Sequence, residues 1–163
     1  MTIYFYKVHE PYGCFSNFSP HPVEIESTNW LTVEHYYQAQ KFVGTADAVV
    51  IPMIQAAPTP EQAAALGRDR ARTVRSDWEQ VKTQVMYAAV LKKFLTHLDI
   101  QAVLISTGDK LIVENSPTDC YWGCGQDNTG QNHLGRILMR VRQEIKQRLA
   151  LQSRSDRIDG EFL

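Results

Sequence analysis

The strongest constraint on the fold is the spacing of apolar residues in two long segments. In residues 76–97, apolar side chains follow one another at helical intervals, at Trp78, Val81, Val85, Ala89 and Phe94. Residues 133–149 repeat the pattern with Leu134, Ile137, Leu138, Val141, Ile145 and Leu149. Such spacing places an apolar stripe along a helix, and the stripe has to be buried against another element. Two long amphipathic helices are therefore expected.

Shorter helices are predicted by composition and by the residues at their ends. A helix over residues 33–43 has Thr32 as a suitable N-cap and Gly44 as a suitable C′ residue. An Ala-rich helix is expected over residues 60–66, and another short helix over residues 100–105.

The two long helices carry capping signals of their own. Ser76 and Glu79 have the spacing of a capping box at the start of the helix over residues 76–97. Asn132 precedes the last helix, so it is expected to be the N-cap there.

Strands are expected near both ends of the chain. Residues 2–6, 23–26 and 111–113 are rich in β-branched or alternating apolar residues. Helices outnumber strands, which predicts an α+β fold, mostly helical, with a small sheet. Residues 1–150 are expected to form one domain, and residues 151–163, which are polar and aperiodic, a C-terminal tail.

Composition indicates an ordinary globular protein of the cytoplasm. The chain has 163 residues, of which 44% are hydrophobic, and no apolar run approaches the length of a membrane helix. A net charge of −1 provides no general attraction to nucleic acid or to an acidic membrane. The odd number of cysteines, Cys14, Cys120 and Cys124, and an N-terminus unlike a secretion signal indicate free thiols in a reducing compartment.

No cofactor or metal is expected. Cys120 and Cys124 are separated by three residues, which is not a usual zinc spacing, and no second pair completes a site. The sequence sets no oligomeric state.

One short segment places chemically useful side chains on one face of a helix. Glu34, Gln38 and Lys41 are spaced i, i+4 and i+7. A solvated stripe with ordinary ion pairing is the simplest interpretation. However, the helix also carries Tyr36, Tyr37 and Phe42, so most of its surface should be buried. A carboxylate and an amine on such a helix favour a cleft.

A glycine-rich loop before the last helix is the second candidate. Gly123 and Gly125 allow sharp turns and a close approach to a ligand, and Trp122 offers a flat face for stacking a base. The N-terminus of the following helix attracts anions, and Arg136 in its first turn is unfavourable there unless a phosphate binds nearby. The alternative is a plain glycine loop anchored by a buried tryptophan.

Three further polar residues have two interpretations each. Asn17 is either a satisfied turn residue or a ligand contact. Arg68, which follows a helix-ending glycine, is either a surface cation or a phosphate clamp. Asn132 is a candidate substrate contact as well as a cap.

The chain resembles the YbiA-like NADAR family over nearly all of residues 1–150. The resemblance rests on motifs that occur in the family's order: Phe15-Ser16-Asn17-Phe18, residues 30–42, Gly67-Arg68, Asp77-Trp78, Tyr121-Trp122-Gly123-x-Gly125 and residues 132–139. It implies a hydrolase, an N-glycosidase acting on ribosides, with Glu34, Lys41 and Trp122 in the active site. It also implies that the lysine forms a Schiff base with the sugar in at least some members.

One position departs from the family. Close relatives often have Trp-Gly-Asp-Gly where this chain has Cys124 in place of the aspartate. Either Asp127 substitutes for the missing carboxylate, or Cys124 marks a different substrate preference.

Roles in cleavage of a ribosyl C1′–N bond follow from the residue types. Glu34 is the candidate for stabilising the oxocarbenium-like state or activating water. Asp127 or a nearby amide is the candidate donor to the leaving base. Lys41 either captures C1′ as a neutral amine or holds a phosphate as an ammonium. Burial favours the first role, and the Glu34 carboxylate opposes it.

The resemblance implies a small ribosyl phosphate as substrate, in the first instance a phosphoribosylamino-pyrimidine intermediate of riboflavin biosynthesis. Removal of ADP-ribose from guanine bases of nucleic acid is the alternative activity. A module that binds an ADP-ribose-like ligand without turnover is the alternative from another class. No membrane partner is expected.

Overall fold

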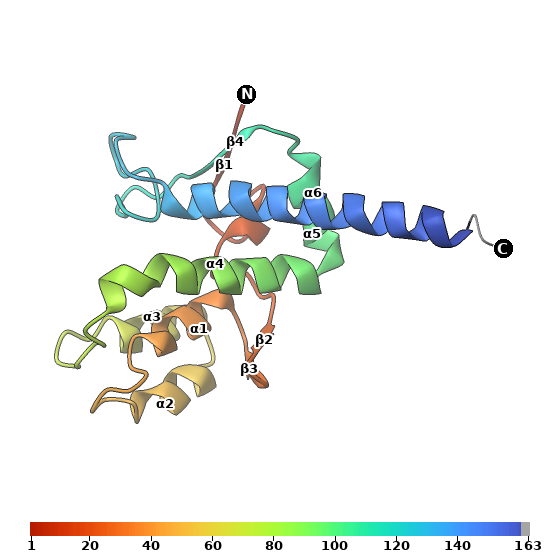
Figure 1. Ribbon diagram of the computed structural model, residues 1–163. Helices are drawn as coiled ribbons and strands as arrows, with labels where there is room; N and C mark the ends of the chain where they lie inside the picture. Colours follow the sequence, from red (N-terminus) through yellow and green to blue (C-terminus); the bar gives the residue numbers. More distant parts are fainter. Residues whose placement is uncertain (161–163) are drawn as a thin grey trace.

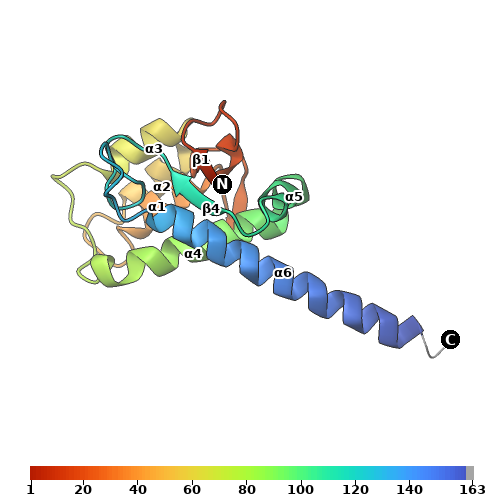
Figure 2. The same ribbon diagram turned by 90° about the horizontal axis from the view of Figure 1, so that it is seen from above.

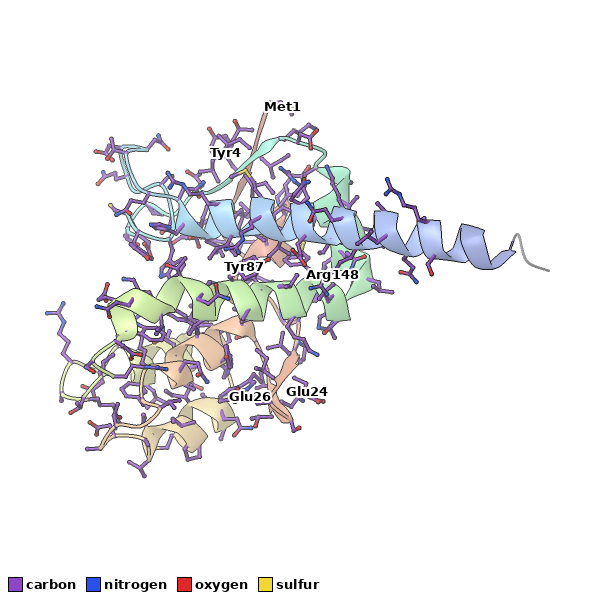
Figure 3. The ribbon with its side chains drawn as sticks, viewed as in Figure 1. Met1, Tyr4, Glu24, Glu26, Tyr87 and Arg148 are labelled. Carbon is purple, nitrogen blue, oxygen red and sulfur yellow. The ribbon has the colours of Figure 1, made fainter. Side chains whose placement is uncertain are left out.

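The computed structural model describes residues 1–160, with side chains through Ser155. The long helix α4 (Trp78–Thr96) crosses the middle of the molecule (Figure 1). The last helix, α6 (His133–Gly160), runs alongside α4 on one side, and Tyr87 lies between the two helices (Figure 3). The two apolar stripes found in the sequence meet at this contact, so the prediction of two long amphipathic helices is confirmed.

Three short helices cover the other side of α4. They are α1 (Val33–Gln40), α2 (Val50–Ala56) and α3 (Pro60–Gly67), and all three contact one another. Thr32 caps α1 as predicted, because its hydroxyl accepts the His35 N–H. The helix α1 ends at Gln40, earlier than predicted, and Gly44 adopts a left-handed conformation (φ 74°) in the following turns.

The strands form two small sheets, so the predicted α+β class with few strands is confirmed. β1 (Thr2–Phe5) pairs in parallel with β4 (Leu111–Glu114), in a register that aligns Phe5 with Glu114. β2 (Val23–Ile25) and β3 (Thr28–Trp30) form an antiparallel hairpin. The 3-10 helix η1 (Gly13–Phe15) precedes β2, and α5 (Leu98–Ser106), which was predicted, leads into β4.

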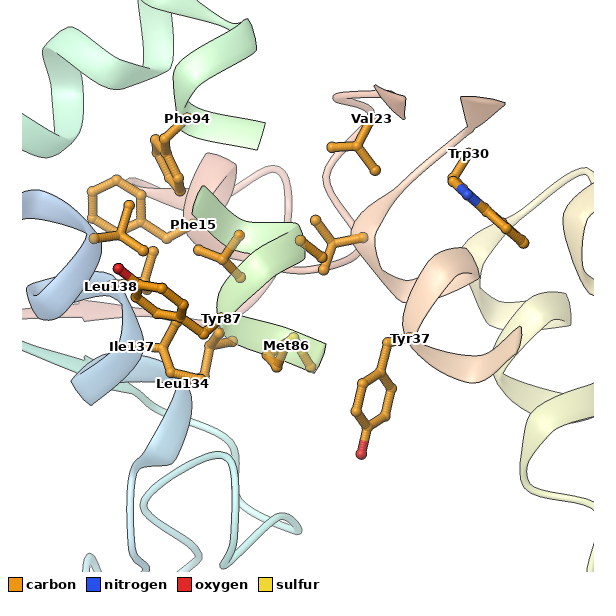
Figure 4. Packing of buried hydrophobic residues seen from close by; sticks show 14 of the residues in the cluster. Phe15, Val23, Trp30, Tyr37, Met86, Tyr87, Phe94, Leu134, Ile137 and Leu138 are labelled. Carbon is orange, nitrogen blue, oxygen red and sulfur yellow. The ribbon is translucent and has the colours of Figure 1, made fainter. Parts of the chain in front are cut away.

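The hydrophobic core extends from α6 through α4 to α1. On one side, Phe15 packs edge-on against Phe94, near Leu138 of α6 (Figure 4). On the other side, Tyr37 of α1 lies beyond Met86. The core therefore ties the first turn-rich segment and α1 to the same helix, and this positions the side chains of the cavity described below.

The predicted capping box at Ser76 is wrong, and Asn132 occupies the predicted position before α6 but uses its side chain elsewhere. Asp77, not Ser76, precedes α4, and its side chain makes no cap bond because it pairs with Arg75 instead. The Asn132 side chain is used to hold β4: its Oδ1 accepts the Glu114 N–H and its Nδ2 donates to the Ile112 carbonyl. At Asn132 bonds to a distant strand replace a local side-chain cap, whereas at Asp77 an ion pair with a near neighbour does so.

The end of the last helix also differs from the prediction. α6 continues through Gly160 rather than ending near residue 149, and Figure 2 shows it projecting from the body of the molecule. Residues 150–159 contain no glycine or proline, so nothing in them stops a helix that has already formed. The polar segment after Ala150 is thus helical as far as it is described, and residues 161–163 of the predicted tail lie outside the described residues.

Candidate active site

A cavity of about 180 Å³ opens where α1, the 16–18 segment, the end of β4 and the 119–122 turn meet. Six of the residues proposed from the sequence line it together: Asn17, Glu34, Gln38, Lys41, Arg68 and Trp122. The helical spacing of Glu34, Gln38 and Lys41 thus places all three in one cavity. The interpretation of a solvated stripe is wrong for this helix.

Glu34 is a buried carboxyl group held on two sides. Gln38 Nε2 donates to Glu34 Oε1 at 2.6 Å, and the backbone N–H of Glu34 donates to the Asn17 carbonyl at 3.2 Å. The Arg68 guanidinium lies 4.0 Å from the same carboxyl oxygen. Burial raises the pKa of Glu34, while the Gln38 hydrogen bond and the positive charges of Arg68 and Lys41 act in the opposite direction.

Lys41 is a partly buried amine with one hydrogen bond to protein. Its Nζ donates to the Gly67 carbonyl at 3.2 Å and lies 5.6 Å from the centre of the Tyr37 ring. Burial lowers the pKa of Lys41 to about 8, and this outweighs the opposing effect of the Glu34 carboxylate. Neutral amine is therefore available near physiological pH, which a nucleophilic lysine requires.

Asn17 and Trp122 both form part of the cavity wall. Asn17 Nδ2 donates to the Met86 sulfur, and its buried Oδ1 has no hydrogen-bond partner in the part of the chain that the structure describes. This oxygen is free to accept a bond from a ligand. The Trp122 ring packs edge-on against Tyr37 and Tyr121, so it is both an anchor and a wall of the cavity.

Two acidic residues of the cavity were missed by the sequence analysis. Glu114 ends strand β4, and Asp119 begins the turn to Trp122. Asp119 Oδ1 accepts the N–H groups of Tyr121 and Trp122, at 2.9 and 2.7 Å. No local signal places Glu114 in the cavity, because its position depends on the pairing of β4 with β1, far apart in the sequence.

The remaining candidates do not line the cavity. Asp127 is exposed, and hydrogen bonds from Thr129 lower the pKa of its carboxyl, so it is unsuited to protonate a group bound inside. Arg136 is exposed on α6. Asn132, as shown above, is occupied with β4.

Gly123 and Gly125 serve the loop itself. A side chain at Gly123 would collide with the Glu114 carbonyl and with Ser116, so glycine lets this loop pack on the end of β4. Gly125 has φ 69°, a conformation that glycine adopts readily. Neither glycine lines the cavity.

Cys124, the departure from the family pattern, is also away from the cavity. Its buried Sγ lies 3.6 Å from Asn115 Oδ1 and 3.5 Å from the Gly125 carbonyl. The carboxyl groups that face the cavity are Glu34, Glu114 and Asp119.

A second, larger hollow adjoins the cavity. It has a volume of about 490 Å³ and shares Ser16, Phe18, Arg68, Glu114 and Asp119 with the first. Lys7 and His9 add basic side chains to its wall. Together the two spaces can accommodate a ligand larger than a single ring.

Neither a metal cluster nor a membrane span is found in the described part of the chain. No group of three or more histidine, cysteine, aspartate or glutamate side chains among residues 1–155 could hold a metal ion. No helix among the described residues is long and apolar enough to cross a membrane. The chemistry available in the cavity is that of carboxyl groups, an amine, a guanidinium and aromatic rings.

Comparison with known proteins places this site in a family. The chain is 67% identical to an N-glycosidase of Nostoc punctiforme over 151 residues, which cover 93% of this chain and 97% of that protein. It is 41% identical to N-glycosidase YbiA of Escherichia coli over 143 residues, 88% of each chain. The riboflavin biosynthesis protein PYRR of Zea mays is 44% identical over 155 residues, 88% of this chain but 25% of that protein.

The fold agrees with these relatives. The NMR structure of the E. coli protein YbiA matches with a TM-score of 0.82 and 39% identity, over 94% of this chain and 87% of that one. The NADAR domain matches residues 4–146, which contain every residue of the cavity. The chain therefore belongs to the NADAR domain family.

Proposed function

We propose that this protein is an N-glycosidase that hydrolyses the C1′–N bond of phosphoribosylamino-pyrimidine intermediates of riboflavin biosynthesis. The observation that carries the proposal is the pairing of Lys41 and Glu34 in one cavity, where burial keeps part of the amine neutral. The names of the N-glycosidase and riboflavin biosynthesis relatives support the choice of bond and of substrate. The three free cysteines support a cytoplasmic location.

In the proposed reaction, neutral Lys41 attacks C1′ of the substrate. The new bond from Nζ to C1′ forms as the bond from C1′ to the base nitrogen breaks, and its electron pair leaves with that nitrogen. Glu34 stabilises the positive charge that develops on the sugar. The sugar ring then opens: the C1′–O4′ bond breaks, O4′ takes a proton from Nζ, and a C=N bond forms between Lys41 and C1′. Water adds to C1′ of this iminium, and the amine of Lys41 departs, releasing the sugar phosphate and restoring the enzyme.

Borohydride trapping tests the covalent step. Reductant added during turnover should leave the sugar permanently attached to Lys41, because reduction converts the C=N bond to a stable amine. Lys41→Arg should lose both the adduct and catalysis, since a guanidinium stays protonated. An active Lys41→Arg enzyme, with no adduct on the wild type, would leave Lys41 as a phosphate contact and place catalysis on water activated by Glu34.

The choice of substrate is tested by assaying both expected classes in parallel. Release of free pyrimidine from a phosphoribosylamino-pyrimidine, without release of ADP-ribose from modified guanine, is the expected result. The reverse selectivity would favour the nucleic-acid substrate. Tight binding of ADP-ribose without turnover of either would favour the binding module and refute the enzyme.

A further inference from the structure

Glu114 is fixed at the junction of the two hollows. Its backbone is held on three sides: its N–H donates to Asn132 Oδ1, its carbonyl accepts from the Cys124 N–H, and β4 pairs with β1 at Phe5. Its side chain lines both the inner cavity and the larger hollow. A group in this place faces a ligand that spans the two spaces.

The Glu114 carboxyl also has an unused oxygen. Oε2 is buried and has no hydrogen-bond partner within the described residues. A buried oxygen without a partner is unfavourable in the resting protein. It is explained if the partner is a group of the bound substrate.

The charges around Glu114 differ from those around Glu34. Glu34 has the Gln38 amide, Arg68 and Lys41 to compensate its negative charge. Around Glu114, burial and the negative charges of Asp119 and Glu34 all act together and raise its pKa to about 8. For Glu34, burial raises the pKa against opposing contributions from Gln38, Arg68 and Lys41. Of the two carboxyl groups, Glu114 is the one whose surroundings favour the protonated form without opposition.

We propose that Glu114 is the catalytic acid that gives its proton to the departing base nitrogen. This assignment rests on the proposed function. As the C1′–N bond breaks, its electron pair on nitrogen takes the Glu114 proton, and the base leaves as a neutral amine. The water that later adds to C1′ returns a proton to Glu114, so the enzyme ends the cycle unchanged.

The other acidic candidates lack one of these properties. Asp127 is exposed and bonded to Thr129. Asp119 uses Oδ1 to hold the N–H groups of Tyr121 and Trp122, which gives it a structural task. Only Glu114, among the three acidic residues of the 114–127 segment, combines burial, a free oxygen and a place on both hollows.

The test uses leaving groups that need the proton to different degrees. The substrates are 5-phosphoribosyl arylamines, with aniline as the more basic and nitroaniline as the less basic leaving amine, and spontaneous hydrolysis is subtracted. Glu114→Gln should lower kcat for the aniline substrate by roughly 10²- to 10⁴-fold, the usual contribution of a general acid. Its kcat for the nitroaniline substrate should fall by less than about tenfold, because that amine leaves more easily without a proton.

Matched variants separate the acid from its surroundings. Asp127→Asn tests the competing acid, and Glu24→Gln, on the exposed face of β2 (labelled in Figure 3), makes the same chemical change far from the cavity. Both are expected to retain the wild-type dependence on the leaving amine. Should Glu114→Gln fail to fold, Glu114→Ala with added formate provides the second measurement, and formate should restore the aniline reaction selectively.

The outcomes distinguish the two proposals. Equal losses on both arylamines, or no loss on either, in a folded Glu114→Gln enzyme would overturn the acid role while leaving the N-glycosidase intact. A large selective loss in Asp127→Asn would also overturn it. A wild-type protein that cleaves no ribosylamine would overturn the proposed function, and the acid role with it.

Discussion

The titration of Lys41 is the most direct consequence of its burial. With a pKa of about 8 in place of the ordinary 10.5, roughly one molecule in ten has a neutral Lys41 amine at pH 7, against about 3 in 10⁴ for an ordinary lysine. Lys41 should therefore condense with a sugar aldehyde up to about 300-fold faster than exposed lysines. The lower basicity of the amine reduces that advantage somewhat.

The assay is reductive alkylation with ribose 5-phosphate and cyanoborohydride, followed by peptide mapping. Labelling of Lys41 should increase about tenfold for each pH unit below 8 and level off above it. Since this measurement uses a sugar phosphate rather than a riboside, it does not depend on the natural substrate. Lys41→Arg is the control and should show no label at this position.

Two charge changes should move the midpoint of the curve of Lys41 labelling against pH in opposite directions. Glu34→Gln removes the negative charge that raises the pKa of Lys41, so its midpoint should move to lower pH. Arg68→Gln removes a positive charge that lowers the same pKa, so its midpoint should move to higher pH. Each shift should be roughly half a unit to one unit at the effective dielectric of a partly buried site. A wild-type midpoint near 10, or shifts of the reversed sign, would refute the assignment.

Three further variants test the site and its support. Glu34→Gln should reduce turnover at least about 100-fold, and near-wild-type hydrolysis would contradict the role of Glu34. Its unfolding temperature should be equal to or higher than that of the wild type, because folding disfavours the charged form of Glu34. Gly67→Ala should lower kcat/KM roughly 10- to 100-fold, since its methyl group would overlap the Gln38 side chain; unchanged kinetics would contradict a role for Gln38. Lys93 is buried and its pKa is lowered to about 7. Between pH 7 and 10 the unfolded chain therefore binds more protons than the folded one, so the free energy of unfolding should rise with pH. Lys93→Met should remove up to about 1.4 kcal/mol per pH unit of that slope in urea titrations, and an unchanged slope would show that Lys93 titrates normally.

Features carried by local periodicity could be predicted from the sequence. The stripes of α4 and α6 repeat over several turns, and Glu34 and Gln38 are one turn apart, so their hydrogen bond follows from helix geometry. Elements whose local residues are unusual for a helix or a hairpin turn were not predicted. α2 contains Pro52 in its first turn, and the β2–β3 hairpin turns through Glu26 and Ser27 at positive φ, where glycine or asparagine would be the usual signal.

The acidic half of the site depended on contacts between distant parts of the chain. Glu114 reaches the cavity only because β4 pairs with β1, more than a hundred residues away in sequence. Asp127 was predicted because it lies three residues after Cys124, and Arg136 because it lies in the first turn of a helix, and neither signal says which way the loop folds. In the structure the loop packs back on β4 through Gly123, which turns Asp119 and Trp122 toward the cavity and leaves Asp127 in solvent.

The acid and the amine of the proposed reaction have a common physical origin. The reaction needs a neutral Lys41 to attack and a protonated Glu114 to donate, and in water near neutral pH each group would carry the opposite form. Burial disfavours the charged state of both, so it lowers the pKa of Lys41 and raises that of Glu114 to about the same value, near 8. For the proposed reaction, the apolar residues that line the cavity together with both groups, Phe18, Met86 and Trp122, belong to the surroundings that favour the two neutral forms.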